Sequence, residues 1–179
     1  MENHLKVLAI CGSTRANSAN LLLLQHLQTI AAPYFNISIY TALDQLPHFN
    51  PDLDTDFPPA EIRELRRLVE KADGIIICTP EYVFSIPGSL KNALEWFVST
   101  TLLSDKPTTL ITASSSGEFA HKELKLIMDT LGARSTEDMA LLIKSIKSKM
   151  SASGEISSSE LITQLQRVVL SLHVFLKSI

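Results

Sequence analysis

The alternation of short apolar runs with stretches of helical periodicity is the feature that most constrains the fold of this chain. Apolar residues cluster in five runs, at 5–11, 36–40, 74–79, 108–113 and 139–143. Between and after these runs, apolar residues recur every three or four positions, as they do in amphipathic helices. Strict alternation of strands and helices predicts an α/β fold, a doubly wound parallel sheet with helices on both faces.

Composition limits the domain count and the class of partner. A chain of 179 residues has room for one such domain, spanning 1–179. A net charge of −3 gives no basic surface of the kind that binds nucleic acid, so we expect no such partner. We expect no membrane span and no secretion signal, because no apolar stretch is long enough. Two cysteines are too few for a disulfide scaffold, so we expect a reducing, cytoplasmic compartment. Cys11 and Cys78 each end an apolar run and are expected to be buried, and no cysteine spacing suggests a metal.

A hydroxyl-rich turn follows the first apolar run and precedes the first helical stretch. The amino terminus of a helix offers free backbone NH groups and a positive dipole end, which together favour an anion. The turn adds side-chain donors that suit a phosphate. These donors are Ser13, Thr14, Arg15, Ser18 and Asn20.

The spacing of the glycines narrows the kind of phosphate ligand. The turn contains neither the GxxxxGK[ST] pattern of nucleoside triphosphate sites nor the GxGxxG pattern of dinucleotide sites. Side chains must therefore surround the phosphate, which suits a terminal monoester with three exposed oxygens. The alternative is an ordinary polar turn in which Ser18 only caps the helix.

A second loop, at 79–88, follows the third apolar run. Pro80 and Pro87 remove two backbone donors and stiffen the loop, while Tyr82 and Phe84 can form a wall for a flat ring. Because the carboxyl ends of parallel strands share one edge of a sheet, this loop should meet the phosphate turn and the loop at 114–120. The sequence therefore predicts a site for a planar, phosphorylated cofactor.

Both loops carry long motifs of a known family. The first reads GSxRxxSxN from Gly12 to Asn20, and the second reads PEYxxSxPGxLKNAxxW from Pro80 to Trp96. On these residues the chain resembles the NADPH-dependent FMN reductases, flavodoxin-like flavoproteins that include quinone, azo-dye and chromate reductases. The resemblance implies the strand order 2-1-3-4-5 and bound FMN. It also implies NADPH or NADH as electron donor, a small-molecule acceptor, and a homodimer or homotetramer that pairs through the region of Trp96 and Phe97.

The resemblance also assigns the cofactor-binding residues. It places the FMN phosphate among Ser13, Arg15, Ser18 and Asn20. It places the isoalloxazine ring along Pro80, Glu81, Tyr82, Val83 and Phe84, with the pyrimidine side of the ring covered by Ser114, Ser115, Ser116 and Gly117. Because the flavin carries the chemistry, we expect neither a catalytic side chain nor a metal. For Glu81 we leave open whether it orders its loop or tunes the flavin.

Two departures from the family pattern affect the expected activity. Val83 stands where many members have asparagine, and Ala120 and His121 stand where many have a glycine pair. The latter change could narrow the approach of the nicotinamide or the acceptor. His121 is expected to face solvent, with a role in protonating the acceptor or contacting the donor as the alternative.

Three further expectations concern function and local structure. The alternative to a reductase is a flavin-binding electron carrier or redox sensor without nicotinamide activity, although a carrier would need a more acidic surface than −3 provides. The long connection at 43–59 is expected to flank the site or an interface, or else to be a plain surface excursion. Ser157 and Glu160 are expected to form a capping box, and the lysines at 144–149 to be solvated.

Overall fold

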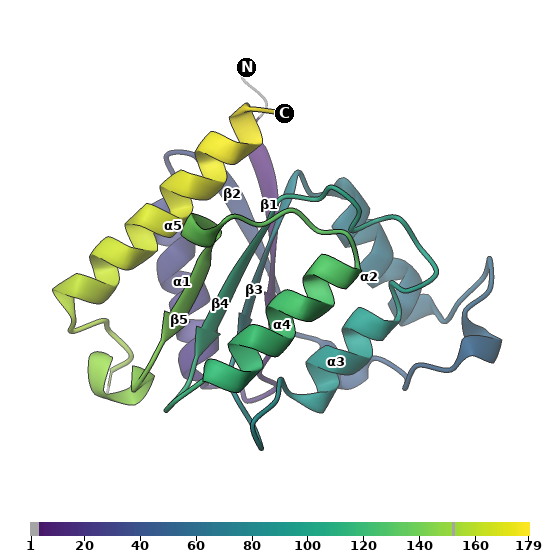
Figure 1. The fold of residues 1–179 in the computed structure, drawn as a ribbon, viewed down its shortest axis with the longest axis horizontal. Helices are drawn as coiled ribbons and strands as arrows, with labels where there is room; N and C mark the ends of the chain where they lie inside the picture. Colours follow the sequence, from purple (N-terminus) through teal and green to yellow (C-terminus); the bar gives the residue numbers. More distant parts are fainter. Residues whose placement is uncertain (1–3, 152) are drawn as a thin grey trace.

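Five parallel strands form the centre of this computed structural model, which describes residues 4–151 and 153–179. They are β1 (Leu5–Cys11), β2 (Phe35–Tyr40), β3 (Gly74–Thr79), β4 (Thr108–Ala113) and β5 (Ala140–Ile143). Their order in the sheet is β2-β1-β3-β4-β5 (Figure 1). This confirms the predicted flavodoxin-like topology. Three strands have the predicted bounds, while β2 begins one residue earlier and β5 one residue later.

Helices cover both faces of the sheet, as Figure 1 shows. They are α1 (Ala19–Ala31), α2 (Ala60–Lys71), α3 (Gly88–Glu95), α4 (Glu118–Thr130) and α5 (Ser159–Lys177). One apolar core lies beneath α1 and α5, and a second lies beneath α2, α3 and α4. The strands β3 and β4 are buried along their whole length, which explains the aliphatic run in the centre of β3, while β4 buries three threonines beside its aliphatic residues. Among the described residues, no helix combines the length and apolarity that a membrane crossing requires.

The start of α5 differs from the predicted capping box. Its N-cap is Ser158, whose side chain accepts a hydrogen bond from the amide of Leu161 at 3.2 Å. Ser157 instead donates its own amide to the carbonyl of Lys149, which holds it in the preceding turn. The prediction of a Ser157–Glu160 box was therefore wrong by one position, because a backbone contact with a distant segment decides where the helix begins.

The long connection between β2 and α2 packs against α3. The side chain of Asn92 accepts the amide of Phe49 at 2.7 Å and donates to the carbonyl of Pro47 at 3.0 Å. The indole of Trp96 donates to the same carbonyl. Trp96 and Phe97 are fully buried in the core beneath α2, α3 and α4. The part of the connection around Pro47 and Phe49 is thus fixed to the α3 side of the molecule, whereas residues 51–57 are mostly exposed.

Candidate active site

The carboxyl edge of the sheet holds a polar cavity of about 330 Å³. The strand order reverses between β1 and β3, and the loops that follow β1, β3 and β4 converge at this point. A fourth segment, the 3-10 helix η4 (Ile146–Lys149), closes one side. The lining residues are Ser13, Arg15, Ser18, Ala19, Asn20, Pro80, Glu81, Tyr82, Ala113, Ser114, Ser115, Ile146 and Lys147.

The first loop brings hydroxyl groups and helix amides to this cavity. Ser18 is the N-cap of α1, and its side chain accepts the amide of Leu21 at 3.1 Å. Ser13 is likewise buried and accepts the amide of Arg15 at 3.4 Å. Each hydroxyl keeps a proton that it can donate to an anion. Arg15 itself is exposed at the rim, where its guanidinium has room to reach a bound group.

Gly12 allows the first loop to approach β3 closely. Its amide donates to the carbonyl of Cys78 at 2.7 Å. A Cβ atom at this position would lie 2.6 Å from Oγ1 and 2.8 Å from Cβ of Thr79, closer than carbon atoms can pack. The glycine therefore sets the distance between the first and second loops.

Asn20 lies inside the cavity wall with its side chain directed at the sheet. Its amide nitrogen donates to the carbonyl of Ala113 at 3.3 Å, and its oxygen accepts the Cys78 thiol at 3.2 Å. The side chain thus joins the ends of β3 and β4 to α1. What Asn20 offers toward the cavity is its backbone amide, in the first turn of the helix.

The second loop presents exposed aromatic side chains beside the cavity. Tyr82 and Ser85 exchange backbone hydrogen bonds across a tight turn, with Val83 and Phe84 at its tip. Both tip residues have positive φ, 52° and 59°, a conformation that costs a β-branched residue such as valine most. Phe84 packs edge-on against Phe119, with ring centroids 5.3 Å apart. Tyr82 lines the cavity, whereas Val83 and Phe84 project beyond it and are largely exposed.

Two glutamates brace the second loop against α4. The carboxylate of Glu81 accepts the amides of Gly117, Phe119 and Ala120 at 3.0 to 3.1 Å. It therefore satisfies the free NH groups at the start of the helix, where a negative charge also gains dipole energy. From the next turn of α4, Glu123 accepts the hydroxyl of Ser85 at 2.6 Å and an adjacent amide. Glu81 is thus a loop-ordering residue, one of the two alternatives that the sequence left open.

The third loop divides into two parts. Ser114 and Ser115 line the cavity. Ser116 and Gly117 do not; Gly117 instead adopts φ of +87° and donates its amide to Glu81. A Cβ atom at Gly117 would lie 2.9 Å from Leu142. The loop thus offers hydroxyls to a ligand at its start and a helix entry at its end.

Ala120 and His121 correct two expectations. Ala120 is completely buried in the core under α4, so it cannot narrow the approach of a substrate. His121 is half-buried and not fully solvent-facing; its Nδ1 lies 3.0 Å from the hydroxyl of Thr112 on β4. Burial lowers the pKa of the imidazole. Among the smaller effects, the charge of Glu137 raises this pKa and the charge of Lys125 lowers it. The ring is therefore neutral near pH 7 and belongs to the support of the third loop.

Two cavity residues were missed by the sequence interpretation. Ile146 and Lys147, from η4, line the cavity opposite the second loop. The lysine-containing segment at 144–149 was expected to be merely solvated, yet the turn after β5 brings Lys147 to the same cavity as Arg15. The position of this segment could have identified these two residues, because it follows a strand of the parallel sheet at the edge where ligands bind.

The two cysteines are structural, as expected. Cys11 and Cys78 are paired in register on neighbouring strands, and both are buried. Burial raises the pKa of both thiols, so neither supplies a thiolate nucleophile. Within 4–151 and 153–179, no group of three potential metal ligands gathers.

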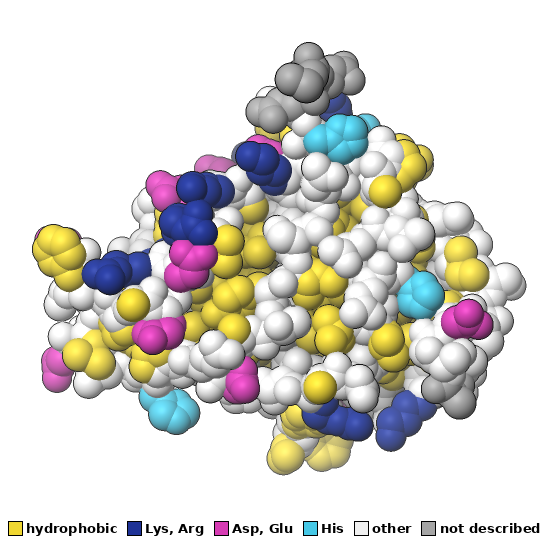
Figure 2. Space-filling model, turned by 180° about the vertical axis from the view of Figure 1, so that it is seen from behind, with side chains coloured by type: hydrophobic (Ala, Val, Ile, Leu, Met, Phe, Trp, Pro, Cys, Tyr) yellow, Lys and Arg dark blue, Asp and Glu magenta, His cyan; other side chains and the backbone are white. Residues whose placement is uncertain are grey.

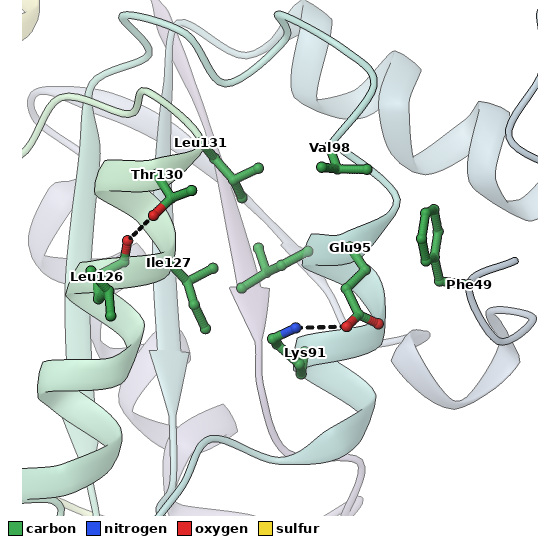
Figure 3. Close-up of a pocket in the computed structure, with 9 residues that line it drawn as sticks. Phe49, Lys91, Glu95, Val98, Leu126, Ile127, Thr130 and Leu131 are labelled. Atoms are coloured by element: carbon green, nitrogen blue, oxygen red, sulfur yellow. Dashed lines mark hydrogen bonds and ion pairs between the residues drawn. The ribbon is translucent and has the colours of Figure 1, made fainter. Parts of the chain in front are cut away.

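An apolar groove of about 310 Å³ lies between α3 and α4, away from the polar cavity (Figure 3). Val98 and Leu126 line it and are about two-thirds exposed. Phe49, from the long connection, closes one side, and Lys91 and Glu95 form an ion pair at the rim. The long connection therefore contributes to this groove and not to the polar cavity.

Comparison with known proteins identifies the family. The model of the NADPH-dependent FMN reductase family matches residues 5–147. A subunit of an NADH:(hydroxy)cinnamate reductase from Vibrio ruber is 34% identical over 169 residues, covering 90% of this chain and 82% of the relative. A 2-hydroxy-1,4-benzoquinone reductase from a Burkholderia species is 31% identical over 168 residues, covering 90% of this chain and 91% of the relative.

A solved structure shows the same architecture. FerB, a flavoenzyme NAD(P)H:(acceptor) oxidoreductase from Paracoccus denitrificans, superimposes with a TM-score of 0.83 at 26% identity and covers 97% of this chain and 98% of its own. The matched span contains both loop motifs and all five strands. The chain therefore belongs to the NADPH-dependent FMN reductase family, oxidoreductases that use FMN and a reduced nicotinamide nucleotide.

Proposed function

We propose that this protein transfers electrons from NADPH or NADH through bound FMN to a small quinone-type acceptor. The observation that carries the proposal is the convergence of three loops and η4 on one cavity at the switch point of the sheet. Bound FMN would supply the redox chemistry by taking up a hydride and releasing electrons to the acceptor. The protein residues bind and orient the cofactor and its substrates.

The cavity residues fit FMN. A phosphate at the start of α1 would receive the hydroxyl protons of Ser13 and Ser18 and the charge of Arg15. The proposed cofactor-binding residues are Ser13, Arg15, Ser18, Asn20, Pro80, Glu81, Tyr82, Val83, Phe84, Ser114, Ser115, Ser116 and Gly117. Of these, Glu81 and Gly117 would act by fixing the shape of the cavity, because their polar groups already bond to each other.

The exposed aromatic tip supports a flat acceptor. Tyr82, Phe84 and Phe119 stand together at the mouth of the cavity, and rings of this kind stack on planar molecules. No water-exposed acid or base is needed at this position, because a quinone can take its protons from solvent. The quinone reductase among the relatives supports this acceptor class.

The alternative, an electron carrier or sensor without nicotinamide activity, would need a surface for steering a protein partner. Figure 2 shows acidic and basic side chains interspersed on one face of the molecule, with no extended patch of either sign. The net charge of −3 points the same way. We therefore favour the reductase.

An anaerobic spectrum separates the two functions. The FMN-loaded protein should be yellow and should bleach when NADPH or NADH is added, and a benzoquinone should restore the colour. A protein that holds FMN but bleaches with neither nucleotide would be a carrier or sensor. A protein that bleaches but is not reoxidised by quinones would keep the reductase assignment and lose the proposed acceptor.

We propose that the apolar groove is a homodimer interface in a cytoplasmic protein. The groove is lined almost entirely by carbon, and the Lys91–Glu95 pair at its rim is self-complementary under a two-fold axis. Leu126→Glu should convert a dimer into monomers in light scattering. Leu170→Glu, at an exposed leucine on α5, is the matched control and should leave the dimer intact. Equal behaviour of the two variants would place any interface elsewhere.

A further inference from the structure

A second cavity, of about 390 Å³, adjoins the FMN cavity on the α1 side. The two cavities share Arg15, Ala19 and Lys147. A ligand can therefore extend from one to the other along this common rim. The remaining lining residues of the second cavity are Asn17, Leu22, Met150, Ser151, Ser153 and Gly154.

The second cavity is positively charged. Among the described residues, Arg15 and Lys147 belong to no ion pair, whereas Lys144, directly after β5, pairs with Glu118. No carboxylate lines this cavity. Because the proposed function assigns Arg15 to the FMN phosphate, Lys147 is the cation of this cavity that remains for a second anion, to which it would add a charge-assisted hydrogen bond.

The cavity also has an apolar floor and a fixed wall. Leu22 of α1 and Met150 supply carbon surface on which a flat base can rest. The wall turn after Met150 is tied to α1, because His26 Nε2 lies 3.1 Å from the carbonyl of Gly154. Gly154 itself packs against Leu22, so closely that a Cβ atom there would lie 3.0 Å from the leucine. The combination of cations and apolar floor suits a nucleoside phosphate.

FMN cannot supply this second anion, because its single phosphate has its own donors at the start of α1. The other ligand that must meet FMN is the nicotinamide nucleotide, whose adenosine end carries the remaining phosphates. A terminal monoester holds close to two negative charges at pH 7, so it gains more from a nearby cation than a singly charged bridging phosphate does. We propose that the second cavity binds the adenosine 2′-phosphate end of NADPH, with Lys147 as the residue that selects NADPH over NADH; this inference rests on the proposed reductase function.

Titration calorimetry with adenosine 2′,5′-bisphosphate tests the subsite without turnover. The FMN-loaded wild type should bind this probe at least about tenfold more tightly than adenosine 5′-monophosphate. Lys147→Ala should weaken the affinity for the probe by about tenfold or more. Lys149→Ala removes the same charge from a residue outside both cavities and should change this affinity by less than about twofold. Asn17→Asp, which alters only the second cavity, should weaken it as well.

Kinetics supply the second readout. Lys147→Ala should raise KM for NADPH by about tenfold with little change in kcat, and should affect NADH much less. Failure of the wild type to bind the probe, or equal affinities for Lys147→Ala and Lys149→Ala, would overturn the subsite. If NADPH still bleaches the flavin in that case, the reductase function survives and only the subsite is lost. If the probe binds as expected but NADPH bleaches nothing, the reductase function fails instead.

Discussion

The first and second loops meet at the same cavity but are held in place by opposite means. The first loop, 12–18, is fixed from within, by a close backbone approach at Gly12 and by buried side chains. The second loop, 80–87, is fixed from outside, by carboxylates at Glu81 and Glu123 that reach between it and α4. Its own tip remains exposed.

This difference shows that a match to a family motif does not tell which residues touch a ligand. In the first loop, the polar motif residues Ser13 and Ser18 face the cavity. In the second loop, the carboxylate of the charged motif residue Glu81 accepts hydrogen bonds from helix amides. The spacing of the motif residues locates the loops, but hydrogen bonds to distant elements determine what each side chain does.

Gly12→Ala should give the largest effect, because it attacks the close approach directly. We expect the free energy of unfolding to fall by about 3 kcal/mol, the upper range for overpacking, with loss of FMN affinity. Gly88→Ala is the control: nothing lies within 4 Å of its Cβ position, and it should gain about 0.5 kcal/mol. Urea denaturation measures both. Equal stabilities would show that the first loop is not held by tight packing.

Arg15→Ala should separate binding from stability in the first loop. FMN affinity should weaken by about 1.5 to 3 kcal/mol, the worth of hydrogen bonds to a charged group, while the free energy of unfolding of the FMN-free protein stays within about 0.5 kcal/mol. Fluorescence titration of FMN measures the first quantity. Thr14→Ala, at an exposed neighbour that does not line the cavity, should bind FMN normally. Normal binding by Arg15→Ala would contradict the proposed phosphate contact.

Glu81→Gln tests the external brace. One neutral oxygen replaces a carboxylate that accepts three amides, so we expect a loss of about 1.5 kcal/mol in unfolding free energy. Glu118→Gln, at an exposed glutamate in the same helix turn, removes only a surface ion pair and should leave the free energy of unfolding almost unchanged. Faster hydrogen exchange at 82–85 in Glu81→Gln alone would locate the effect in the second loop. Similar losses in the two variants would argue against a brace.

Val83→Asn should have the smallest effect and the opposite sign. Asparagine tolerates positive φ better than valine, so we expect the free energy of unfolding to rise by about 0.5 to 1 kcal/mol. Val174→Asn, at an exposed valine within α5, should leave stability almost unchanged, because the two residues have similar helix propensity. Thermal unfolding compares them. A destabilised Val83→Asn would mean that contacts of the valine side chain outweigh the backbone strain.

The fold could be predicted almost completely, because its signals are local. Aliphatic runs locate buried strands, and strict alternation with helices leaves few topologies; the strand order itself came from the family resemblance. The misplaced cap at Ser157 failed for a physical reason, since the contact of its amide with Lys149 joins segments that form separate turns. Such a contact cannot be recognised from the spacing of apolar residues along the sequence.

The site could be predicted only in part. The three loops were located correctly, because parallel strands end at one edge. The contribution of Lys147 was missed, since a lysine-rich turn looks the same whether it faces solvent or a cavity. The inward position of Ala120 and the Thr112 contact of His121 were missed because hydrogen bonds between α4 and the second loop, made by Glu81 and Glu123, fix how the helix lies on the sheet.

The attachment of Glu81 to the start of α4 has a consequence for how this protein can be re-engineered. The carboxylate couples the wall of the cavity to the helix, so the frame stays rigid while the tip at Val83 and Phe84 carries no structural hydrogen bond through its side chains. The side chains at the tip can therefore be exchanged without breaking the hydrogen bonds that hold the loop. A library confined to those two positions and Phe119 should retune acceptor preference, together with the contacts that the tip makes to the flavin ring, while leaving the scaffold undisturbed.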